Sequence, residues 1–583
     1  MVEETNKSIM LFGEVASAGL ARGPAFVCGC AKDVVVPRRT IDASEAIREM
    51  ERFDVAISEA ERELLELQEK VRQKVGKQEA EIFEVQILLL HDSSLREKVS
   101  ALCLMQKMNV EAALDEAIDT LTSAFVRLED PYFRERAADL RDVGKRLLDV
   151  LAKDQRSEVP IFPDGSVIVT PELLPSMIVQ LDSQTIHGVI VEKGGQTAHA
   201  TILARARQIP LLIHVPDATK TIRTGDPLIV DGLAGRVFIH PTPAIRREYD
   251  RLEADLQAHQ TALKGLIDLP AVTRDGVSIK LYANIGKSAD AVAAATLNAD
   301  GVGLYRTEFV FLVQDHFPSE EEQYLMYRTT ADRLKPREVV IRALDIGSDK
   351  LLSYFPLPRE ANPSLGCRGT RLLLAHPEIL HAQLRAILRL SATHPVSILF
   401  PMIGGMEELR AAKAAIESVK ASLAVEHESF NPRIPVGAMI ETPAAAIMTG
   451  QLAQEVDFFS VGTNDLVQYL LTTDRTSSEV ASYYEPLHPA MLQVLASVVA
   501  VANAKGKRIS ICGEIAGNPA YTQLLLGLGF RSLSVSPGEI LEIKNAIRST
   551  SMQQAEDVAR RILESDTIQE IKACLRAANA PTQ

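Results

Sequence analysis

The segment GGQTAHATILARARQIP, residues 194–210, places a histidine just behind two glycines and at the start of an expected helix. Thr197 is a residue type that caps helices, and the unpaired N–H groups of a first helical turn favour an anion. A phosphoryl group carried on His199 would be stabilised there by the helix dipole. Taken alone, the pattern also fits an ordinary histidine beside a helix cap.

A second group of polar residues follows apolar runs in the C-terminal half of the chain. They are Arg306, Arg342, Lys350, Glu441, Asn464, Asp465, Arg475 and Cys512. Two carboxylates suit a hard cation such as Mg²⁺, which takes one or two protein carboxylates together with substrate oxygens. The positively charged arginine and lysine side chains suit a small, multiply charged anion that bears phosphate or carboxylate. Any single arginine or glutamate also fits a surface ion pair, and a cysteine also fits a buried apolar contact, so the inference depends on their convergence.

The elements that must bring these residues together are strands and helices in alternation. After Leu269, each candidate apolar strand is followed by a stretch with helical periodicity. The strand candidates end at Ile285, Leu304, Ile346, Met402, Glu441, Gly462, Cys512 and Val535. Eight such repeats over about 310 residues predict a (β/α)8 TIM barrel. In a barrel of this kind the chemistry lies at the carboxyl ends of the strands, which is where the polar residues occur.

The N-terminal half predicts a different architecture. Short apolar runs punctuated by glycine and proline precede residue 37 and resume after residue 155, as is typical of strands. Between them, an amphipathic segment rich in Glu, Ala and Leu predicts helices. We therefore expect a multidomain protein in which an α/β domain carries an inserted helical bundle and precedes the barrel. The expected boundaries are 1–36 and 155–242 for the α/β domain, 37–154 for the insertion, 243–270 for a helical linker and 271–583 for the barrel.

Composition narrows the functional classes. A formal net charge of −14 over 583 residues disfavours nucleic acid or an anionic membrane as the main partner. The six cysteines show no paired C-x-x-C spacing and the N-terminus is acidic and polar, so a reducing cytoplasm is expected. No apolar run approaches the roughly 20 residues that a membrane span needs.

Several motifs together resemble those of one enzyme family. GGQTAHATILAR is similar to the phosphohistidine signature of enzymes that use phosphoenolpyruvate (PEP). GVGLYRTEF, DIGSDK, NPSLGCRGTR, ETPAAA, VDFFSVGTNDLVQY and CGEIAG resemble the barrel motifs of enzyme I of the phosphotransferase system, the PEP–protein phosphotransferases. The motifs keep the expected order over almost the entire chain, which makes the match more specific than any single residue.

The resemblance implies a role for each matched residue. His199 would take the phosphoryl group from PEP, and Glu441 and Asp465 would bind Mg²⁺. Cys512 would protonate the enolate left behind to give pyruvate, a role that suits a thiol because its ordinary pKa of about 8.5 keeps it protonated at neutral pH. Substrate phosphate and carboxylate would be held by Arg306, Arg342, Lys350, Arg368, Asn464, Asp465 and Arg475.

The same resemblance implies partners and movement. The α/β domain that carries His199 would swivel between the barrel and the helical insertion, where the small phosphocarrier protein HPr would dock. Residues 243–267 would form the hinge. The phosphoryl group would pass to a histidine of HPr as the first step of sugar uptake, and the barrel would form a homodimer.

Close to His199, several residues differ from those common in the family's sequences. Gln196 and Ala198 replace an arginine and a serine, and ELLPS at 172–176 replaces a DLTPS-like run. His214 stands where a glycine is common. These changes border the histidine and bear on rate or carrier preference, because every expected barrel ligand is intact.

Three other functions are compatible with parts of the sequence. A PEP synthase or pyruvate phosphate dikinase would need an ATP-binding domain ahead of the histidine domain, and the text before residue 155 contains no glycine-rich phosphate loop. A non-catalytic scaffold would not require intact barrel residues. An enzyme I that serves a regulatory pathway is the third, although no additional N-terminal sensory domain supports it.

Overall fold

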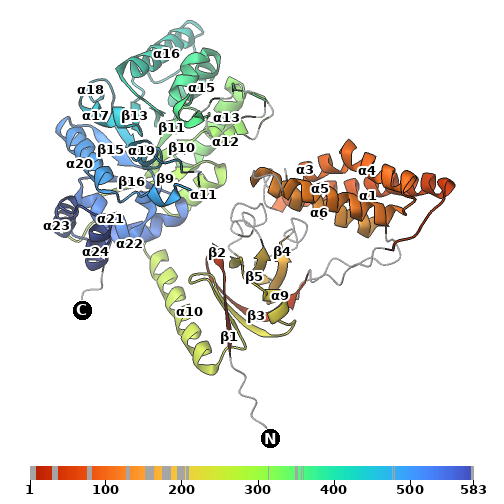
Figure 1. Ribbon diagram of the computed structural model, residues 1–583. Helices are drawn as coiled ribbons and strands as arrows, with labels where there is room; N and C mark the ends of the chain where they lie inside the picture. The colour runs from red at the N-terminus through yellow and green to blue at the C-terminus, as the bar shows by residue number, and fades with distance from the viewer. Residues whose placement is uncertain are drawn as a thin grey trace. The chain divides into compact units, whose positions relative to one another are not determined.

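The computed structural model describes residues 8–28, 37–74, 82–126, 131–151, 163–173, 186–193, 204, 209–312, 314, 316–347, 352, 354, 355, 357, 358, 360, 362–475, 477 and 479–579. The chain divides into two compact units, Met1–Leu256 and Gln257–Gln583. The first unit holds a mixed sheet and a helical bundle, and the second holds a barrel of strands surrounded by helices (Figure 1).

The second unit contains a closed barrel of eight parallel strands. Each strand is hydrogen-bonded to the next along the chain, and the last strand pairs with the first to close the barrel. The strands are β9 Lys280–Ile285, β10 Gly301–Arg306, β11 Glu338–Arg342, β12 Val396–Phe400, β13 Val436–Ile440, β14 Phe458–Val461, β15 Arg508–Ile511 and β16 Ser532–Val535. The predicted (β/α)8 barrel is therefore confirmed.

Helices cover the outside of the barrel. The longer ones are α11 Ser288–Thr296, α13 Glu320–Leu334, α15 Pro377–Ser391, α16 Met406–Val425, α20 Pro489–Ala504, α21 Pro519–Gly527, α22 Ile540–Ser549, α23 Met552–Leu563 and α24 Ile568–Ala578. Shorter helices at the strand ends are α12 Glu308–Leu312, α14 Thr370–Ala375, α17 Pro443–Ile447, α18 Thr449–Leu452 and α19 Thr463–Leu470. Their apolar faces pack against the outward side chains of the strands in one continuous core. Local sequence defines where they start: Ser319 and Glu322 form a capping box that begins α13.

The interior of the barrel is filled by side chains. The residues that point inward from alternate positions of the strands form a separate buried cluster of Leu304, Val340, Leu399, Met439, Phe458 and Cys512. This packing leaves the rim at the carboxyl ends of the strands as the place where a substrate can reach the barrel residues.

One strand ends earlier than the sequence predicts. The apolar run through Ile346 predicts a strand to that residue, but β11 ends at Arg342. The N–H of Ala343 still donates to the Leu399 carbonyl of the neighbouring strand at 2.8 Å. The next N–H, that of Leu344, donates to the side chain of Gln383 at 2.9 Å, so the chain leaves the sheet there while remaining buried. Apolar content alone does not show this exchange of hydrogen-bond partners.

The first unit contains an eight-stranded mixed sheet. Its spatial order is β1-β8-β7-β3-β4-β5-β6-β2, with β3, β4, β5 and β6 parallel and the remaining pairs antiparallel. The strands are β1 Ile9–Phe12, β2 Glu14–Ser17, β3 Leu20–Val27, β4 Ser166–Glu172, β5 Ile186–Lys193, β6 Leu211–Ile213, β7 Pro227–Asp231 and β8 Arg236–Ile239. Buried clusters line both faces, and the short helix α9 Ala218–Thr221 contributes to one of them.

A helical bundle is inserted between β3 and β4. Its helices are α1 Ala43–Lys74, α3 Ile82–Leu90, α4 Ser93–Met105, α5 Val110–Val126 and α6 Pro131–Leu151. Phe53, Phe83, Leu114 and Leu147 are each at most 1% exposed in its core. The insertion thus has a hydrophobic core of its own, separate from the two cores of the sheet.

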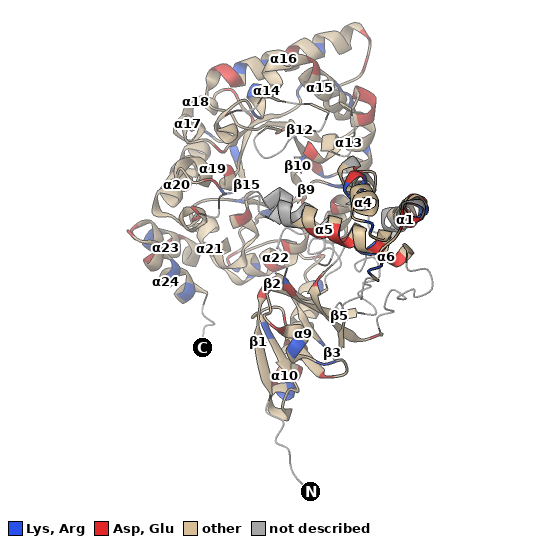
Figure 2. Cartoon of the chain, turned by 45° about the vertical axis from the view of Figure 1, so that its right-hand side comes forward, with Lys and Arg blue, Asp and Glu red and all other residues tan. Residues whose placement is uncertain are grey.

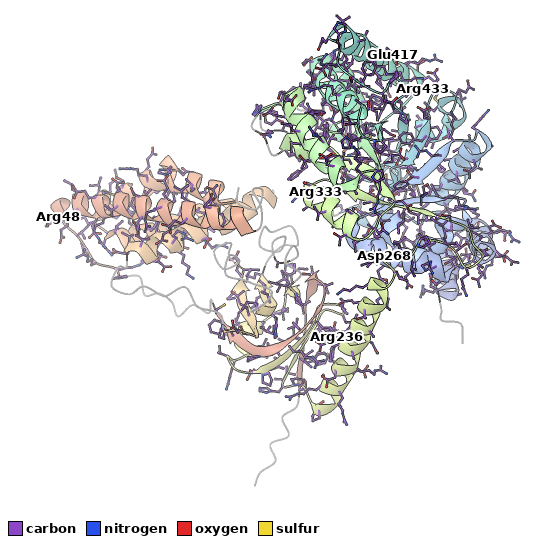
Figure 3. The ribbon with its side chains drawn as sticks, turned by 180° about the vertical axis from the view of Figure 1, so that it is seen from behind. Arg48, Arg236, Asp268, Arg333, Glu417 and Arg433 are labelled. Atoms are coloured by element: carbon purple, nitrogen blue, oxygen red, sulfur yellow. The ribbon has the colours of Figure 1, made fainter. Side chains whose placement is uncertain are left out.

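Helix α10, Pro243–Lys264, runs from one unit into the other. In the first unit, the hydroxyl of Tyr249 donates to Asp231 Oδ2 at 2.6 Å. In the second unit, Nζ of Lys544 donates to the carbonyl of Ile267 at 2.9 Å, close to Asp268, which is labelled in Figure 3. Residues 250–262 between these contacts are exposed.

Basic and acidic residues alternate along the outer helices, as the colouring of Figure 2 shows. No helix in the described part of the chain is long and apolar enough to cross a membrane.

Candidate active site

Two arginines lie side by side at the carboxyl ends of adjacent barrel strands. Arg306 ends β10 and Arg342 ends β11, and the two residues are partners in the parallel register. Arg306 is exposed, whereas Arg342 is only 4% exposed. The rim therefore presents one accessible and one buried guanidinium, which suits a ligand with more than one negative charge.

The buried Arg342 is paired with two carboxylates. Its Nη2 donates to Glu308 in α12, and its Nη1 lies 3.4 Å from Asp345 Oδ2. Burial lowers the pKa of Arg342, but Glu308 and Asp345 raise it by more, so the guanidinium stays charged. Its Nε is buried and has no hydrogen-bond partner among the described residues, which leaves one N–H available to a ligand.

Arg368 completes a buried network of ion pairs. It is 2% exposed, and its Nη1 donates to Asp465 Oδ1 at 3.0 Å while its Nη2 donates to Asp345 Oδ2 at 3.0 Å. Asp345 therefore bridges Arg342 and Arg368. Gly347, with a φ of 110°, makes this packing possible because a Cβ there would lie 2.7 Å from the Cβ of Arg368.

Glu441 directly follows β13 and lies in the same network. It is 1% exposed, and its Oε1 accepts the N–H of Met402 at 2.5 Å. Met402 has a φ of 52°, an uncommon backbone conformation for a residue other than glycine. Burial, together with the charges of Asp465 and Asp345, raises the pKa of Glu441 to about 8 against the opposing effects of Arg342 and the Met402 N–H. Two buried carboxylates that repel each other are stabilised by a shared cation.

Glu441 and Asp465 fit a divalent cation that is held partly by substrate. Mg²⁺ commonly takes one or two protein carboxylates and completes its shell with substrate oxygens and water. Gly462 lies beside this pair, and a Cβ there would come within 2.7 Å of Glu441 Oε2. Within the described ranges, no group of three or more His, Cys, Asp or Glu side chains could hold a metal ion.

Cys512 lies one residue beyond β15, inside the rim. It is 2% exposed, its Sγ donates to the Val461 carbonyl at 3.3 Å, and it accepts a hydrogen bond from Ser460 Oγ at 3.2 Å. Burial raises the pKa of the Cys512 thiol to about 11, so the side chain is a neutral thiol at neutral pH. A protonated thiol is a group that can give up a proton in a reaction.

Asn464 and Arg475 lie beyond β14. Asn464 exchanges two hydrogen bonds with Glu514, with Nδ2 donating at 2.9 Å and Oδ1 accepting the Glu514 N–H at 3.1 Å. The Asn464 carbonyl accepts the Tyr484 hydroxyl at 3.1 Å, and the charge of Arg475 acts on that same tyrosine. The half-buried Arg475 is held through its backbone N–H by the side chain of Gln468 at 3.3 Å. Both residues thus act on Tyr484, and Asn464 directly precedes Asp465 of the arginine network in α19.

Two predicted site residues, His199 and Lys350, lie outside the described residues, as does the Gly-Gly segment that precedes His199. The neighbouring backbone is described: β5 ends at Lys193, and Ala204 is helical and fully buried. The departure at His214 has a structural counterpart, because this residue has a φ of 53°, which glycine adopts without strain. Its Nδ1 lies 3.2 Å from Glu14 Oε1.

Sequence reasoning missed three residues that the structure places in the site. Asp345 bridges two of the expected arginines, Glu308 pairs with Arg342, and Ser460 contacts Cys512. All three occur inside motifs that are readable in the sequence, namely GVGLYRTEF, DIGSDK and VDFFSVGTNDLVQY. Their position within these motifs was the available signal, but only their side-chain contacts show what they do.

The barrel rim and the mixed sheet correspond to domains of one enzyme class. Residues 260–552 match the PEP-binding domain of PEP-utilising enzymes, residues 13–136 match the N-terminal domain of these enzymes, and residues 162–235 match their mobile domain. These matches define the class as the PEP-utilising enzymes.

Curated relatives narrow the class further. The phosphoenolpyruvate-protein phosphotransferase of Haemophilus influenzae (strain ATCC 51907 / DSM 11121 / KW20 / Rd) is 38% identical over 96% of this chain and 98% of that protein. Those of Geobacillus stearothermophilus and Bacillus subtilis (strain 168) are each 37% identical, over 96% and 97% of this chain and 96% and 99% of their own lengths. The chain belongs to the phosphoenolpyruvate-protein phosphotransferase family and is a phosphotransferase. The enzyme class expected from the sequence motifs is thereby confirmed.

Proposed function

We propose that His199 accepts the phosphoryl group of PEP, with release of pyruvate, and passes it to a histidine of HPr. The segment that contains His199 follows the carboxyl end of β5, which has the parallel strands β4 and β6 on its two sides. Ligands of α/β sheets bind beyond the carboxyl ends of parallel strands, and the two glycines allow close approach. The names of the curated relatives, which describe transfer from PEP to a protein, support the same reaction.

The observation that carries the substrate assignment is the convergence of arginines and carboxylates at the barrel rim. Arg342 and Arg368 each keep a buried Nε with no hydrogen-bond partner in the described part of the chain. These donors, with the exposed Arg306, would bind the phosphate and carboxylate of PEP. Lys350, Asn464, Asp465 and Arg475 would complete the substrate site.

Glu441 and Asp465 would hold Mg²⁺ in this arrangement. When bound, the ion would neutralise charge on the transferred phosphoryl group. The arginines would align that group with the His199 lone pair, and alignment together with charge neutralisation is most of what phosphoryl transfer needs.

Cys512 would supply the proton that completes the reaction. As the bond between the PEP bridging oxygen and phosphorus breaks, phosphorus bonds to the imidazole nitrogen of His199 and the enolate of pyruvate remains. The S–H bond of Cys512 then breaks, its proton joins C3 of the enolate, and the electron pair stays on sulfur. The raised thiol pKa supports this assignment because it keeps the proton on sulfur until the enolate forms.

The second half of the reaction would use the helical insertion. HPr would dock on α1–α6, and the sheet domain would swivel about the exposed part of α10 between that site and the barrel.

We further propose that the barrel forms a homodimer. Cys103, Cys367, Cys512 and Cys574, in the part of the chain that the structure describes, are free thiols, which supports a reducing cytoplasm.

The decisive experiment is labelling with radioactive PEP in the presence of Mg²⁺. Wild-type protein should acquire an acid-labile label and release one pyruvate for each phosphoryl group bound, and the label should be chased by HPr. His199→Ala should acquire none. His187→Ala is the matched control, because His187 lies on β5 of the same domain and should leave labelling unchanged. Equal labelling of wild type and His199→Ala would contradict the assignment of the acceptor.

A further inference from the structure

The thiol of Cys512 is held by a short chain of hydroxyl groups inside the barrel. Ser510 Oγ donates to Ser460 Oγ at 3.3 Å, Ser460 Oγ donates to Cys512 Sγ at 3.2 Å, and Cys512 Sγ donates to the Val461 carbonyl at 3.3 Å. Ser460 is fully buried and Cys512 is 2% exposed. Each donor in the chain therefore has an acceptor, and the sulfur receives its hydrogen bond from inside the protein.

The barrel register explains why these groups meet. Ser460 of β14 and Ser510 of β15 are directly paired in the parallel ladder. Cys512 lies two positions after Ser510, so both side chains point to the interior of the barrel. The backbone of Cys512 is fixed separately, because Asn284 Nδ2 of β9 donates to its carbonyl at 3.0 Å. A change at Ser460 would therefore remove a contact of the sulfur without releasing the main chain.

The charged groups that act on the thiol come from three other strands. Arg306 at the end of β10 and Arg342 at the end of β11 favour the thiolate, whereas Glu441 beyond β13 and the burial of the site oppose it. Ser460 is the uncharged donor in direct contact with the sulfur, and its hydrogen bond also favours the thiolate. A hydrogen bond to an ionised acceptor is stronger than one to a neutral acceptor.

We propose that Ser460 is a positioning residue for the proposed proton donor, whose hydroxyl orients the Cys512 sulfur and stabilises the thiolate that forms when the thiol has given its proton to the enolate. The inference rests on the proposed role of Cys512. Ser460 itself touches neither substrate nor metal and acts only through the cysteine.

The proton balance of the step is simple. The S–H group turns from the Val461 carbonyl towards C3 of the enolate, the proton moves to carbon, and the electron pair remains on sulfur. The thiolate keeps the hydrogen bond from Ser460, which retains its own proton. After pyruvate leaves, a solvent water supplies a proton to the thiolate and the resulting hydroxide passes to the buffer. The single proton of the Ser510 hydroxyl has two acceptors in reach, Ser460 Oγ at 3.3 Å and the Phe459 carbonyl at 3.4 Å, so Ser510 is an auxiliary contact and Ser460 is the donor to sulfur.

The first test is the rate of pyruvate release in a single turnover of the full-length protein with PEP and Mg²⁺. Ser460→Ala should slow release about tenfold, the size of effect that a change of about one pKa unit gives. Ser397→Ala is the matched control, because Ser397 is a buried barrel serine whose hydroxyl donates to Glu338 at 2.8 Å. Its rate should stay within about twofold of wild type.

The second test measures the alkylation rate of Cys512, which loss of packing alone would not lower. The rate at which iodoacetamide alkylates Cys512 at pH 8, measured by mass spectrometry of the Cys512 peptide, reports the thiolate fraction. It should fall about tenfold in Ser460→Ala, because loss of the donor raises the thiol pKa by about one unit. A Thr/Val pair at residue 460 keeps shape constant and varies only the hydroxyl. Ser460→Thr should retain both rates and Ser460→Val should lose both, so the comparison holds even where Ser460→Ala does not fold.

The outcomes separate this inference from the proposed function. Slow release and slow alkylation in the variants without a hydroxyl, with normal rates in Ser460→Thr and Ser397→Ala, would support it. Wild-type rates in Ser460→Ala, or equal rates in the Thr and Val variants, would overturn it. Cys512→Ala decides the underlying assignment: wild-type pyruvate release in that variant would remove Cys512 as the proton donor and the inference with it. Loss of release in Cys512→Ala with normal release in Ser460→Ala would overturn only the role of Ser460.

Discussion

Arg368 and Asp465 are 97 positions apart in the sequence, yet Nη1 of the arginine lies 3.0 Å from Oδ1 of the aspartate at the barrel rim. Arg368 lies just before α14 and Asp465 lies in the first turn of α19, so the pair joins two separate βα repeats. Asp345 accepts from the other end of the same guanidinium. Because all three groups have left water, each depends on the others for compensation of its charge.

Removing this arginine should destabilise the barrel strongly. Arg368→Met keeps most of the side-chain volume but leaves Asp345 and Asp465 buried beside each other without the guanidinium between them. The expected loss is about 3–5 kcal/mol in the free energy of unfolding of the barrel, together with loss of PEP binding. Urea denaturation monitored by circular dichroism measures the first effect. Arg371→Met is the control, since its pair with Glu408 is half exposed and should contribute less than about 1 kcal/mol.

The ion pair between Glu338 and Arg508 should make barrel stability depend on pH. Burial raises the pKa of Glu338, but Arg508 and Ser397 lower it by more, so its folded value lies below its ordinary one. The carboxylate therefore contributes stability above the unfolded pKa of about 4.3, and this contribution is lost as pH falls through the folded value. Since the arginine is partly exposed, Glu338→Gln should cost roughly 1 kcal/mol at pH 7. Denaturation at pH 7 and at successively lower pH should show this difference shrink to zero.

A difference between Glu338→Gln and wild type that grew on acidification would contradict this sign. Glu417→Gln is the matched control, because Glu417 is labelled on the barrel surface in Figure 3 and its side chain is 70% exposed in its pair with Lys420. Its substitution should leave stability unchanged within about 0.5 kcal/mol.

The two proposed metal ligands should couple Mg²⁺ to substrate binding. Wild-type protein should bind a non-reactive PEP analogue at least tenfold more tightly with Mg²⁺ than with a chelator, a difference of about 1.4 kcal/mol. Glu441→Gln and Asp465→Asn should lose this difference, and isothermal titration calorimetry would measure it. Glu455→Gln, on the barrel surface, should retain it. Persistence of the Mg²⁺ effect in Glu441→Gln would show that the ion binds elsewhere.

The helical insertion should be needed for the second half-reaction only. Phe53 is fully buried in its core, so Phe53→Ala should destabilise the insertion by about 3–5 kcal/mol. Labelling by PEP should persist, while transfer of the label to HPr should fall sharply. Val55→Ala, on the same helix but 57% exposed, should fold normally. The two transfers are followed separately by counting label on each protein. Equal loss of both would show that the insertion is not specific to the second half-reaction.

Much of the fold was predictable because its signals are local. The alternation of short apolar segments with amphipathic helical segments predicted the eight strands of the barrel. The predicted strand ends at Ile285 and Val535 match those of β9 and β16. The end of β11 was predicted four residues late, because the hydrogen bond from Leu344 to Gln383 comes from a distant helix. The positions of β1 and β2 at opposite ends of one sheet could not be predicted either, because strand order depends on pairing between distant segments.

The sequence by itself determined the family, the barrel, and which arginines, carboxylates and cysteine follow the barrel strands. Residue type, helical period and motif order are properties of short stretches of chain, and they survive without coordinates. Only the tertiary structure decided that Asp345 joins Arg342 to Arg368, that Glu441 is buried beside other carboxylates, and that Ser460 contacts Cys512. These relationships depend on barrel closure and strand register, which bring side chains from different repeats to one rim and remove them from water.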